Sequence, residues 1–325
     1  MKTKMTEMLG IQYPIMQGGM QNLGVPELAA AVSEAGGLGT INVATFPALD
    51  DLRNAIRAVK ARTSKPFAVN ISLVPALKPG KELFDQLAII LDEGVTVIET
   101  AGASPQELAD FVNQHKDQLK WIHKAACVKH GKKAESMGAD IITMAGYEVA
   151  GHPHTDGIGT MVLANKAAQE IKVPVLAAGG IVDGRSMLAA LSMGCEGVVL
   201  GTRFVASKEC TISENHKQWI LDHNENDTVL CQKSIRNMVR VANNEAAKKC
   251  LALEAKGATL EELMTVIAGR LGREAYATGN VDGGLYPVGP AIGLIHDVPT
   301  CAEIIQGMVA EAEAQLALTN KIFAE

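Results

Sequence analysis

The first two-thirds of the sequence alternate short apolar runs with longer amphipathic stretches, and this alternation constrains the fold more than any other feature. Eight short runs are apolar at nearly every position, which is typical of strands buried on both faces of a parallel sheet. The expected strands are Tyr13–Gln17, Leu38–Val43, Phe67–Ser72, Thr96–Thr100, Trp121–Ala125, Asp140–Ala145, Val173–Ala177 and Gly197–Leu200. Eight such strands predict an α/β fold, a closed TIM (β/α)8 barrel, with an open doubly wound sheet as the structural alternative.

Helix-like segments separate these strands. They include Pro26–Ala35, Leu49–Ala61, Glu82–Glu93, Pro105–Gln114 and Ser186–Met193. Several helix-like segments end in a glycine, such as Gly36, Gly94 and Gly194, where a helix C-cap commonly requires a left-handed residue.

The pattern changes after residue 210. Helices are predicted at Ser213–His223, Ile235–Lys256 and Leu260–Ala268, without a convincing strand, followed by a loop over Gly269–Gly293. A barrel of residues 1–210 is already complete, so we predict that residues 211–287 form a smaller, mostly helical cap domain inserted after strand eight. The remaining segment, 288–325, is expected to end in a helix, about Thr300–Phe323, that packs back on the barrel.

Composition excludes several classes of protein. The 325 residues are 47% hydrophobic and 20% charged, which is enough apolar material for a large globular core. A net charge of −6 without a basic stripe argues against nucleic acid as a partner. No apolar run is long enough to cross a membrane, and the N-terminus lacks a signal core, so we expect a cytoplasmic protein. Six scattered cysteines without metal-ligand spacing predict reduced thiols and no metal site.

In a TIM barrel, functional residues lie at the C-terminal ends of the strands. After strand one this rule selects Gly18, Gly19 and Met20, where paired glycines let the backbone approach a flat ligand, although a simple tight turn is the alternative. It also selects Asn70 at strand three and Lys124 at strand five. A lone buried lysine is costly, so Lys124 is better explained by function than by structure.

Two glycine-containing turns follow the last two strands. Gly179 and Gly180 come after strand seven, and Gly201 and Thr202 come after strand eight. Loops at these two positions commonly bind phosphate through backbone N–H groups, so the pair of turns predicts a ligand that carries a phosphate.

The loop after strand six contains two histidines among glycines. His152 is the candidate catalytic residue, because an imidazole that titrates near neutrality can exchange protons or hydrogen bonds with a substrate. Ala150 and Gly151 precede it, and Tyr147 lies in the same loop. His154 is better explained as a solvated loop residue, and a metal site would need a third ligand.

A phosphate site at strands seven and eight, with a glycine-lined floor at strand one, would suit FMN across the barrel mouth. Lys124 could then stabilise negative charge on the reduced ring. The residues alone leave two other functions open. One is a flavin-free aldolase-type lyase with Lys124 as Schiff-base nucleophile, and the other is a flavoprotein that binds its cofactor without turnover.

An ordered set of short motifs carries a family resemblance. The motifs are Tyr13–Met20, Val69–Asn70, Glu99–Gly102, His123–Lys124, Ala150–Pro153, Ala178–Gly180, Gly201–Phe204 and Lys233–Asn237. Together they resemble the FMN-dependent nitronate monooxygenase superfamily over nearly the whole chain, and most closely its bacterial NADH:quinone reductase branch. The resemblance implies tightly bound FMN with its phosphate at the two glycine turns, His152 beside the flavin, and reduction of a quinone by NADH or NADPH. A nitronate monooxygenase that oxidises alkyl nitronates with O2 and an FMN-dependent enoyl-acyl carrier protein reductase are the alternatives.

Two positions depart from the related patterns. Leu77 stands where the quinone reductase branch has a glutamine associated with NADH preference, so the coenzyme is left open. Pro75, Leu77 and Tyr147 are the residues we expect in the NAD(P)H or substrate pocket. True nitronate monooxygenases usually have Gly-Gly-His where this chain has Ala150, Gly151 and His152, which favours quinone reduction. The expected partners are a small-molecule substrate, either quinone or nitronate, and a second copy in a homodimer.

Overall fold

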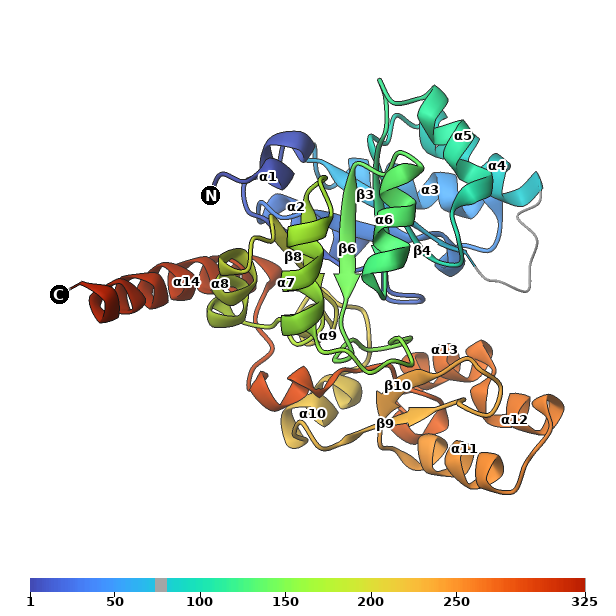
Figure 1. Ribbon diagram of the computed structural model, residues 1–325. Coiled ribbons are helices and arrows are strands. Elements are labelled where there is room, and N and C mark those ends of the chain that lie inside the picture. The colour runs from blue at the N-terminus through green and yellow to red at the C-terminus, as the bar shows by residue number, and fades with distance from the viewer. Residues whose placement is uncertain (74–80, 325) are drawn as a thin grey trace.

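The computed structural model describes residues 1–73 and 81–324, and its main sheet contains eight parallel strands (Figure 1). The strands are β1 (Ile15–Gln17), β2 (Gly39–Asn42), β3 (Phe67–Leu73), β4 (Val97–Gly102), β5 (Lys120–Ala125), β6 (Ile141–Ala145), β7 (Val175–Ala178) and β8 (Gly197–Leu200). They pair in the order β1-β8-β7-β6-β5-β4-β3-β2. Each predicted strand coincides with an observed one within two residues at either end, and the predicted TIM barrel is confirmed.

The barrel closes between β1 and β2 through few contacts. One parallel bridge joins Met16 to Leu38, and the Gln17 N–H donates to the Leu38 carbonyl at 2.9 Å. The fully buried Gln17 side chain extends this seam, because its amide donates to the Thr40 carbonyl at 2.8 Å and accepts from the Thr40 N–H at 3.1 Å. A primary amide has the same donor and acceptor pair as a peptide group, so Gln17 acts as one further step of the ladder.

Helices surround the barrel and close it at the N-terminal ends of its strands. They are α1 (Lys4–Leu9), α2 (Pro26–Glu34), α3 (Leu49–Lys60), α4 (Lys81–Asp92), α5 (Gln106–Gln114), α6 (Val128–Ser136), α7 (Thr160–Glu170), α8 (Gly184–Ser192) and α9 (Thr202–Val205). One apolar cluster fills the space between the sheet and the helices. A second cluster fills the barrel interior toward the N-terminal ends of the strands. Met5 and Leu9 of α1 belong to the interior cluster, so α1 covers the N-terminal end of the barrel. The opposite end, at the C-terminal ends of the strands, is the mouth that is left for chemistry.

The cap differs from its prediction in two places. Its elements are α10 (Glu214–Asp222), β9 (Thr228–Cys231), β10 (Val239–Ala242), α11 (Glu245–Ala255), α12 (Leu260–Ile267) and α13 (Gly269–Thr278). The predicted helix Ile235–Lys256 is wrong in its first part, because Val239–Ala242 pairs antiparallel with β9 in a hairpin. The predicted loop over Gly269–Gly293 is also wrong at its start, where α13 lies.

Tertiary packing explains both differences. Val239 and Val241 belong to an apolar cluster of the cap that also contains Cys250 and Leu263, so the strand is stabilised by burial rather than by local propensity. In α13, Gly272 lowers the helix propensity, but the following segment packs closely against the helix because Gly284 has no side chain: a Cβ on Gly284 would lie 2.8 Å from the Gly272 nitrogen. The domain boundaries at residues 210 and 287 stay predictions.

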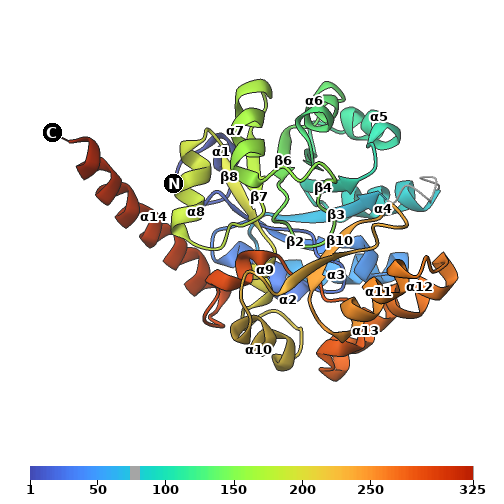
Figure 2. The same cartoon turned by 60° about the horizontal axis from the view of Figure 1, so that its bottom comes forward.

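The final helix, α14 (Cys301–Phe323), is confirmed. Thr300 and Glu303 form a capping box at its start, and Ile304, Ile305 and Met308 are buried against the body. Its last turns project from the body and expose Phe323 (Figure 2). Within residues 1–73 and 81–324, no helix is both long and apolar enough to span a membrane. The homodimer stays a prediction.

Replacing Gln17 with leucine should weaken barrel closure. The substitution leaves the Thr40 N–H and carbonyl buried without partners, and we expect the free energy of unfolding to fall by about 2–4 kcal/mol. Urea denaturation followed by circular dichroism measures the change. Gln114→Leu, on the exposed end of α5, is the matched control, and equal stability of the two variants would contradict the role of Gln17.

Candidate functional site

A polar network crosses three neighbouring strands inside the upper barrel. The Asn42 amide donates to Asn70 Oδ1 at 2.8 Å, and the Asn70 amide donates to Glu99 Oε2 at 2.6 Å. The three residues are register partners on β2, β3 and β4, and all are buried. The second carboxylate oxygen, Glu99 Oε1, is buried without a hydrogen-bond partner in the described chain. This orphaned oxygen can accept a hydrogen bond from a ligand at the mouth.

The loop after β1 lies against this network. A Cβ on Gly19 would overlap the Asn70 side chain, so the backbone approaches the amide as closely as a glycine permits. The Gly18 N–H donates to the Leu200 carbonyl at 2.9 Å, and the Met20 sulfur lies near Gly201 at the end of β8. The predicted residues Gly18, Gly19 and Met20 therefore lie between Asn70 and the turn after β8.

The turns after β7 and β8 have the conformations that glycine permits. Gly179 and Gly180 have φ angles of +104° and +74°, in the left-handed region. A Cβ on Gly179 would lie 2.8 Å from the Thr160 hydroxyl. The Thr202 hydroxyl accepts a hydrogen bond from the Gly289 N–H at 3.1 Å. No hydrogen bond within the described residues is donated by the N–H groups of Gly179, Gly180 or Gly201, so they are available to an anion.

The loop after β6 has a fixed shape. A Cβ on Gly146 would overlap Thr160, and the Glu148 carboxylate accepts from the Thr160 N–H at 2.9 Å and from its hydroxyl at 2.8 Å. Glu148 therefore caps the start of α7 and has a structural role. The hydrogen bonds between Glu148 and Thr160 orient the segment that carries the predicted residues Ala150, Gly151 and His152.

Two reciprocal backbone hydrogen bonds join this loop to the cap. The Gly151 N–H donates to the Arg240 carbonyl at 3.1 Å, and the Arg240 N–H donates to the Gly151 carbonyl at 2.6 Å. The Arg240 guanidinium donates to the Tyr147 carbonyl at 3.1 Å and lies 5.0 Å from the Tyr147 ring centroid. Tyr147 is therefore held against Arg240 of β10. The contacts of Arg240 with Tyr147 and Gly151 place the cap next to His152.

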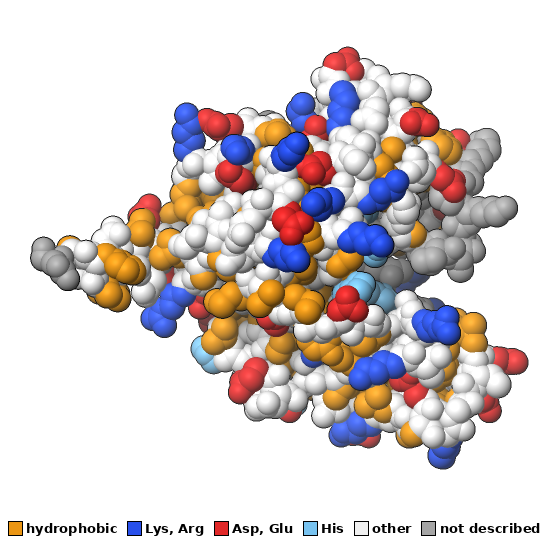
Figure 3. All heavy atoms as spheres, in the orientation of Figure 1, with side chains coloured by type: hydrophobic (Ala, Val, Ile, Leu, Met, Phe, Trp, Pro, Cys, Tyr) orange, Lys and Arg blue, Asp and Glu red, His pale blue; other side chains and the backbone are white. Residues whose placement is uncertain are grey.

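His152 and Lys124 face the same region. Desolvation by the surrounding protein lowers the pKa of the His152 imidazole, and the Lys124 charge lowers it further, while a hydrogen bond with Asn237 acts in the opposite direction. His152 is exposed to solvent. Histidine side chains are visible at the indentation between the barrel and the cap (Figure 3). Lys124 is partly buried and makes no hydrogen bond or ion pair with residues 1–73 or 81–324.

Strand alternation separates Lys124 from its neighbour His123. The His123 imidazole faces the helix layer, where Nδ1 lies 2.8 Å from the Thr100 hydroxyl, and burial lowers its pKa to about 4. Lys124 points inward instead, beside Thr143 of β6, whose buried hydroxyl lacks a partner among the described residues. The lysine is thus the functional candidate of the pair.

The remaining candidates fall outside this arrangement. His154 lies 3.3 Å from Asp156 at the surface, which fits a solvated loop residue. Among the described residues, no cluster of three or more histidine, cysteine or acidic side chains could hold a metal ion. Pro75 and Leu77 lie outside the described residues. Asn42 and Glu99 were missed as site candidates, although a polar residue within an otherwise apolar, buried strand is a signal that the sequence shows.

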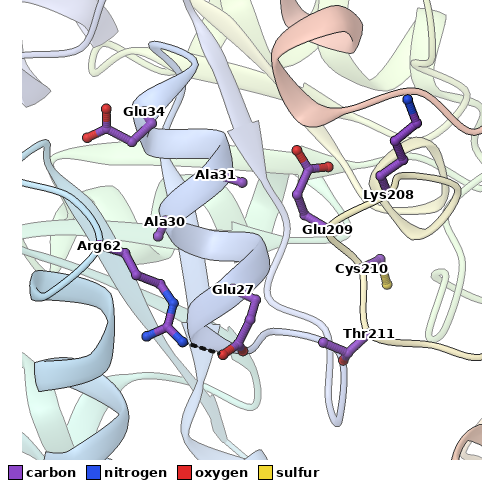
Figure 4. Close-up of a pocket in the computed structure, with 9 residues that line it drawn as sticks. All are labelled: Glu27, Ala30, Ala31, Glu34, Arg62, Lys208, Glu209, Cys210 and Thr211. Carbon is purple, nitrogen blue, oxygen red and sulfur yellow. Dashed lines mark hydrogen bonds and ion pairs between the residues drawn. The ribbon is translucent and has the colours of Figure 1, made fainter.

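A separate groove lies outside the barrel, between α2 and the segment 208–211 (Figure 4). It has a volume of about 530 Å³. Its charged lining includes an ion pair between Arg62 and Glu27, 2.8 Å apart. Because none of the strand-end residues lines it, this groove is not the candidate active site.

A TIM barrel with glycine turns after its last two strands, an inward lysine and a loop histidine beneath a cap defines a class of barrel enzyme that acts on a small-molecule substrate. The sequence matches the family model for nitronate monooxygenase over residues 2–80 and 72–311, and the chain belongs to that family. The protein is accordingly an oxidoreductase of an FMN-dependent family, and the aldolase-type alternative loses its support.

Individual relatives carry several names. The chain is 30% identical to "(3aS,4S,5R,7aS)-5-hydroxy-7a-methyl-1-oxo-octahydro-1H-indene-4-carboxyl-CoA dehydrogenase" of Rhodococcus jostii, over 96% of both chains. It is 32% identical to a probable nitronate monooxygenase of Staphylococcus saprophyticus, over 77% of this chain and 81% of the relative. Among solved structures, FabK from Thermotoga maritima superposes with a TM-score of 0.91 and 34% identity, over 99% of both chains.

The pKa of His152 should respond to Lys124. Because a neighbouring positive charge disfavours the imidazolium form, Lys124→Met should raise the His152 pKa toward its ordinary value of about 6.5. NMR titration of 15N-labelled histidines measures the shift. Lys172→Met, an exposed substitution just before β7, is the control, and an unchanged His152 pKa in Lys124→Met would contradict the coupling.

Proposed function

We propose that the protein is an FMN-dependent NAD(P)H:quinone reductase. The observation that carries the proposal is the proximity, at the barrel mouth next to the cap, of the His152 imidazole, whose pKa is lowered, and the Lys124 ammonium, which has no partner among residues 1–73 and 81–324. The Ala-Gly-His sequence at residues 150–152, in place of Gly-Gly-His, favours this branch of the family over nitronate oxidation.

The residues present fit FMN. The backbone N–H groups of Gly179, Gly180, Gly201 and Thr202 would hold its phosphate, because the first three donate no hydrogen bond to the described protein and the fourth begins α9. The glycine turn after β1 and the buried polar network would receive the ring system. The orphaned Glu99 oxygen supports this fit, because a buried carboxylate oxygen normally has a donor.

When bound, FMN supplies hydride and two-electron transfer between a reduced nicotinamide and an acceptor. The chain's own residues supply electrostatics and orientation. Lys124 would stabilise negative charge at the mouth. His152, neutral near pH 7 because its pKa lies below the ordinary value, would donate a hydrogen bond to a quinone carbonyl oxygen, and Asn237 would orient the imidazole.

The decisive experiment compares donors and acceptors in parallel. The purified protein should be yellow, its flavin should bleach rapidly on anaerobic mixing with NADH or NADPH, and benzoquinone should sustain steady-state turnover. Rapid bleaching by an alkyl nitronate with little by either reduced coenzyme would instead identify a nitronate monooxygenase. A bound flavin that neither donor reduces would identify a passive flavin-binding protein.

The histidines of the β6–α7 loop provide a matched pair of variants. His152→Ala should lower kcat/KM for benzoquinone by about 100-fold, because it removes the hydrogen-bond donor, whereas His154→Ala should leave it within twofold. Steady-state kinetics at pH 7 measures both effects. Similar activity of the two variants would remove His152 from the proposed mechanism.

Oxidation or reduction of an acyl-CoA is a second candidate function. The relative from Mycobacterium tuberculosis shares the dehydrogenase name of the Rhodococcus protein, and the match spans 97% of both chains, against about three-quarters of this chain for the staphylococcal relatives. A panel of acyl-CoA thioesters in the bleaching assay distinguishes this candidate, because a substrate of this class would reduce the bound flavin or reoxidise it.

A further inference from the structure

The turn between β9 and β10, residues 232–238, carries two exposed cations. Lys233 and Arg236 are exposed, and neither forms an ion pair or a side-chain hydrogen bond with residues 1–73 or 81–324. The turn contains no acidic residue, in a chain whose net charge is −6. This local excess of positive charge is therefore available to an anionic ligand.

A single carboxylate holds the turn in shape. Glu254 of α11 accepts from the Gln232 N–H, the Ser234 N–H and the Ser234 hydroxyl, each at 2.8 Å. The Asn237 amide donates to Gln232 Oε1, also at 2.8 Å. These bonds draw both ends of the turn together and present the two cations on a preformed backbone.

The backbone of the turn adopts an uncommon conformation. Gln232 and Arg236 have φ angles of +61° and +55°, and in the described chain only Asn22 is another non-glycine residue with positive φ. Side chains rarely adopt this region, and such residues persist where surrounding contacts impose it, often in ligand-binding segments. The hydrogen bond from the Gln232 N–H to Glu254 is a contact of this kind at the first of the two residues.

The turn lies beside the candidate active site. Asn237, which follows Arg236 in the chain, forms a side-chain hydrogen bond with His152. Arg240 of the following strand forms backbone hydrogen bonds with Gly151. A substrate whose reactive group reaches His152 could therefore extend its remaining length along Lys233 and Arg236.

We propose that this turn binds the phosphates of an adenosine diphosphate group in the substrate, with Lys233 and Arg236 as its phosphate contacts. Guanidinium groups bind phosphate oxygens in bidentate fashion, and a nearby ammonium adds a point charge. For NAD(P)H the inference rests on the proposed function. Coenzyme A contains the same adenosine diphosphate group, so the binding chemistry is shared by both candidate functions.

The test compares two variants of equal charge. Lys233→Ala combined with Arg236→Asn removes the proposed contacts, and asparagine is chosen because it tolerates positive φ. Lys249→Ala combined with Lys256→Ala is the control, because it removes two exposed cations, one in α11 and one just after it, that have no ion pair with the described part of the chain. Isothermal titration calorimetry of the purified holoprotein with ADP should show binding at least tenfold weaker in the first variant and unchanged in the second.

Kinetics with a truncated coenzyme then separates phosphate binding from effects on His152. In the turn variant, KM for NADH should rise about tenfold with kcat within twofold, whereas KM for reduced nicotinamide mononucleotide, which lacks the adenosine half, should not change. Absence of ADP binding to the unmodified protein, equal weakening in both variants, or an equal rise in KM for both coenzymes would overturn the proposal.

Acetyl-CoA titrated in the same calorimeter distinguishes the two sources of the group. If ADP and acetyl-CoA bind through the turn while neither NADH nor NADPH bleaches the flavin, the inference stands and the proposed reductase function fails. If NADH bleaches the flavin equally fast in all variants and ADP binds equally to them, the proposed function stands and the inference fails.

Discussion

The pair of hydrogen bonds between Gly151 and Arg240 connects the two parts of the protein on which chemistry depends. The barrel supplies the lysine, the glycine turns and the buried amides, while the cap supplies Asn237 and the basic turn. Glu148 of the loop that carries His152 binds the first residue of α7, and Gly151 of the same loop pairs with β10. The loop is therefore restrained by both the barrel and the cap. Orientation of the imidazole is therefore a property of the junction and not of either part alone.

Inside the barrel, the polar network has a defined direction. A carboxylate only accepts hydrogen bonds, so Glu99 fixes the orientation of the Asn70 amide, and Asn70 Oδ1 in turn accepts from Asn42. Below this level the interior is apolar and closed by α1. The mouth thus combines a rigid hydrogen-bonding edge with an apolar floor, which suits a planar ligand with a polar rim.

Much of the fold was predictable because the eight strands are buried on both faces and so remain apolar along their length. The β9–β10 hairpin was not, because β9 is only partly buried and both strands owe their stability to each other and to the cap cluster around Val241 and Leu263. Similarly, α13 forms despite Gly272, because packing against Gly284 offsets low local propensity.

The sequence by itself determined the barrel, the strand ends that bear Asn70 and Lys124, and the glycines whose left-handed conformations no other residue adopts as readily. Those features follow from local periodicity and from the backbone freedom of single residue types. Only the tertiary structure decided that Glu99 joins Asn70, that Lys124 and not His123 faces the mouth, and that Asn237 from the cap lies beside His152. These relations depend on strand register and on contacts between residues far apart in the chain, which periodicity does not encode.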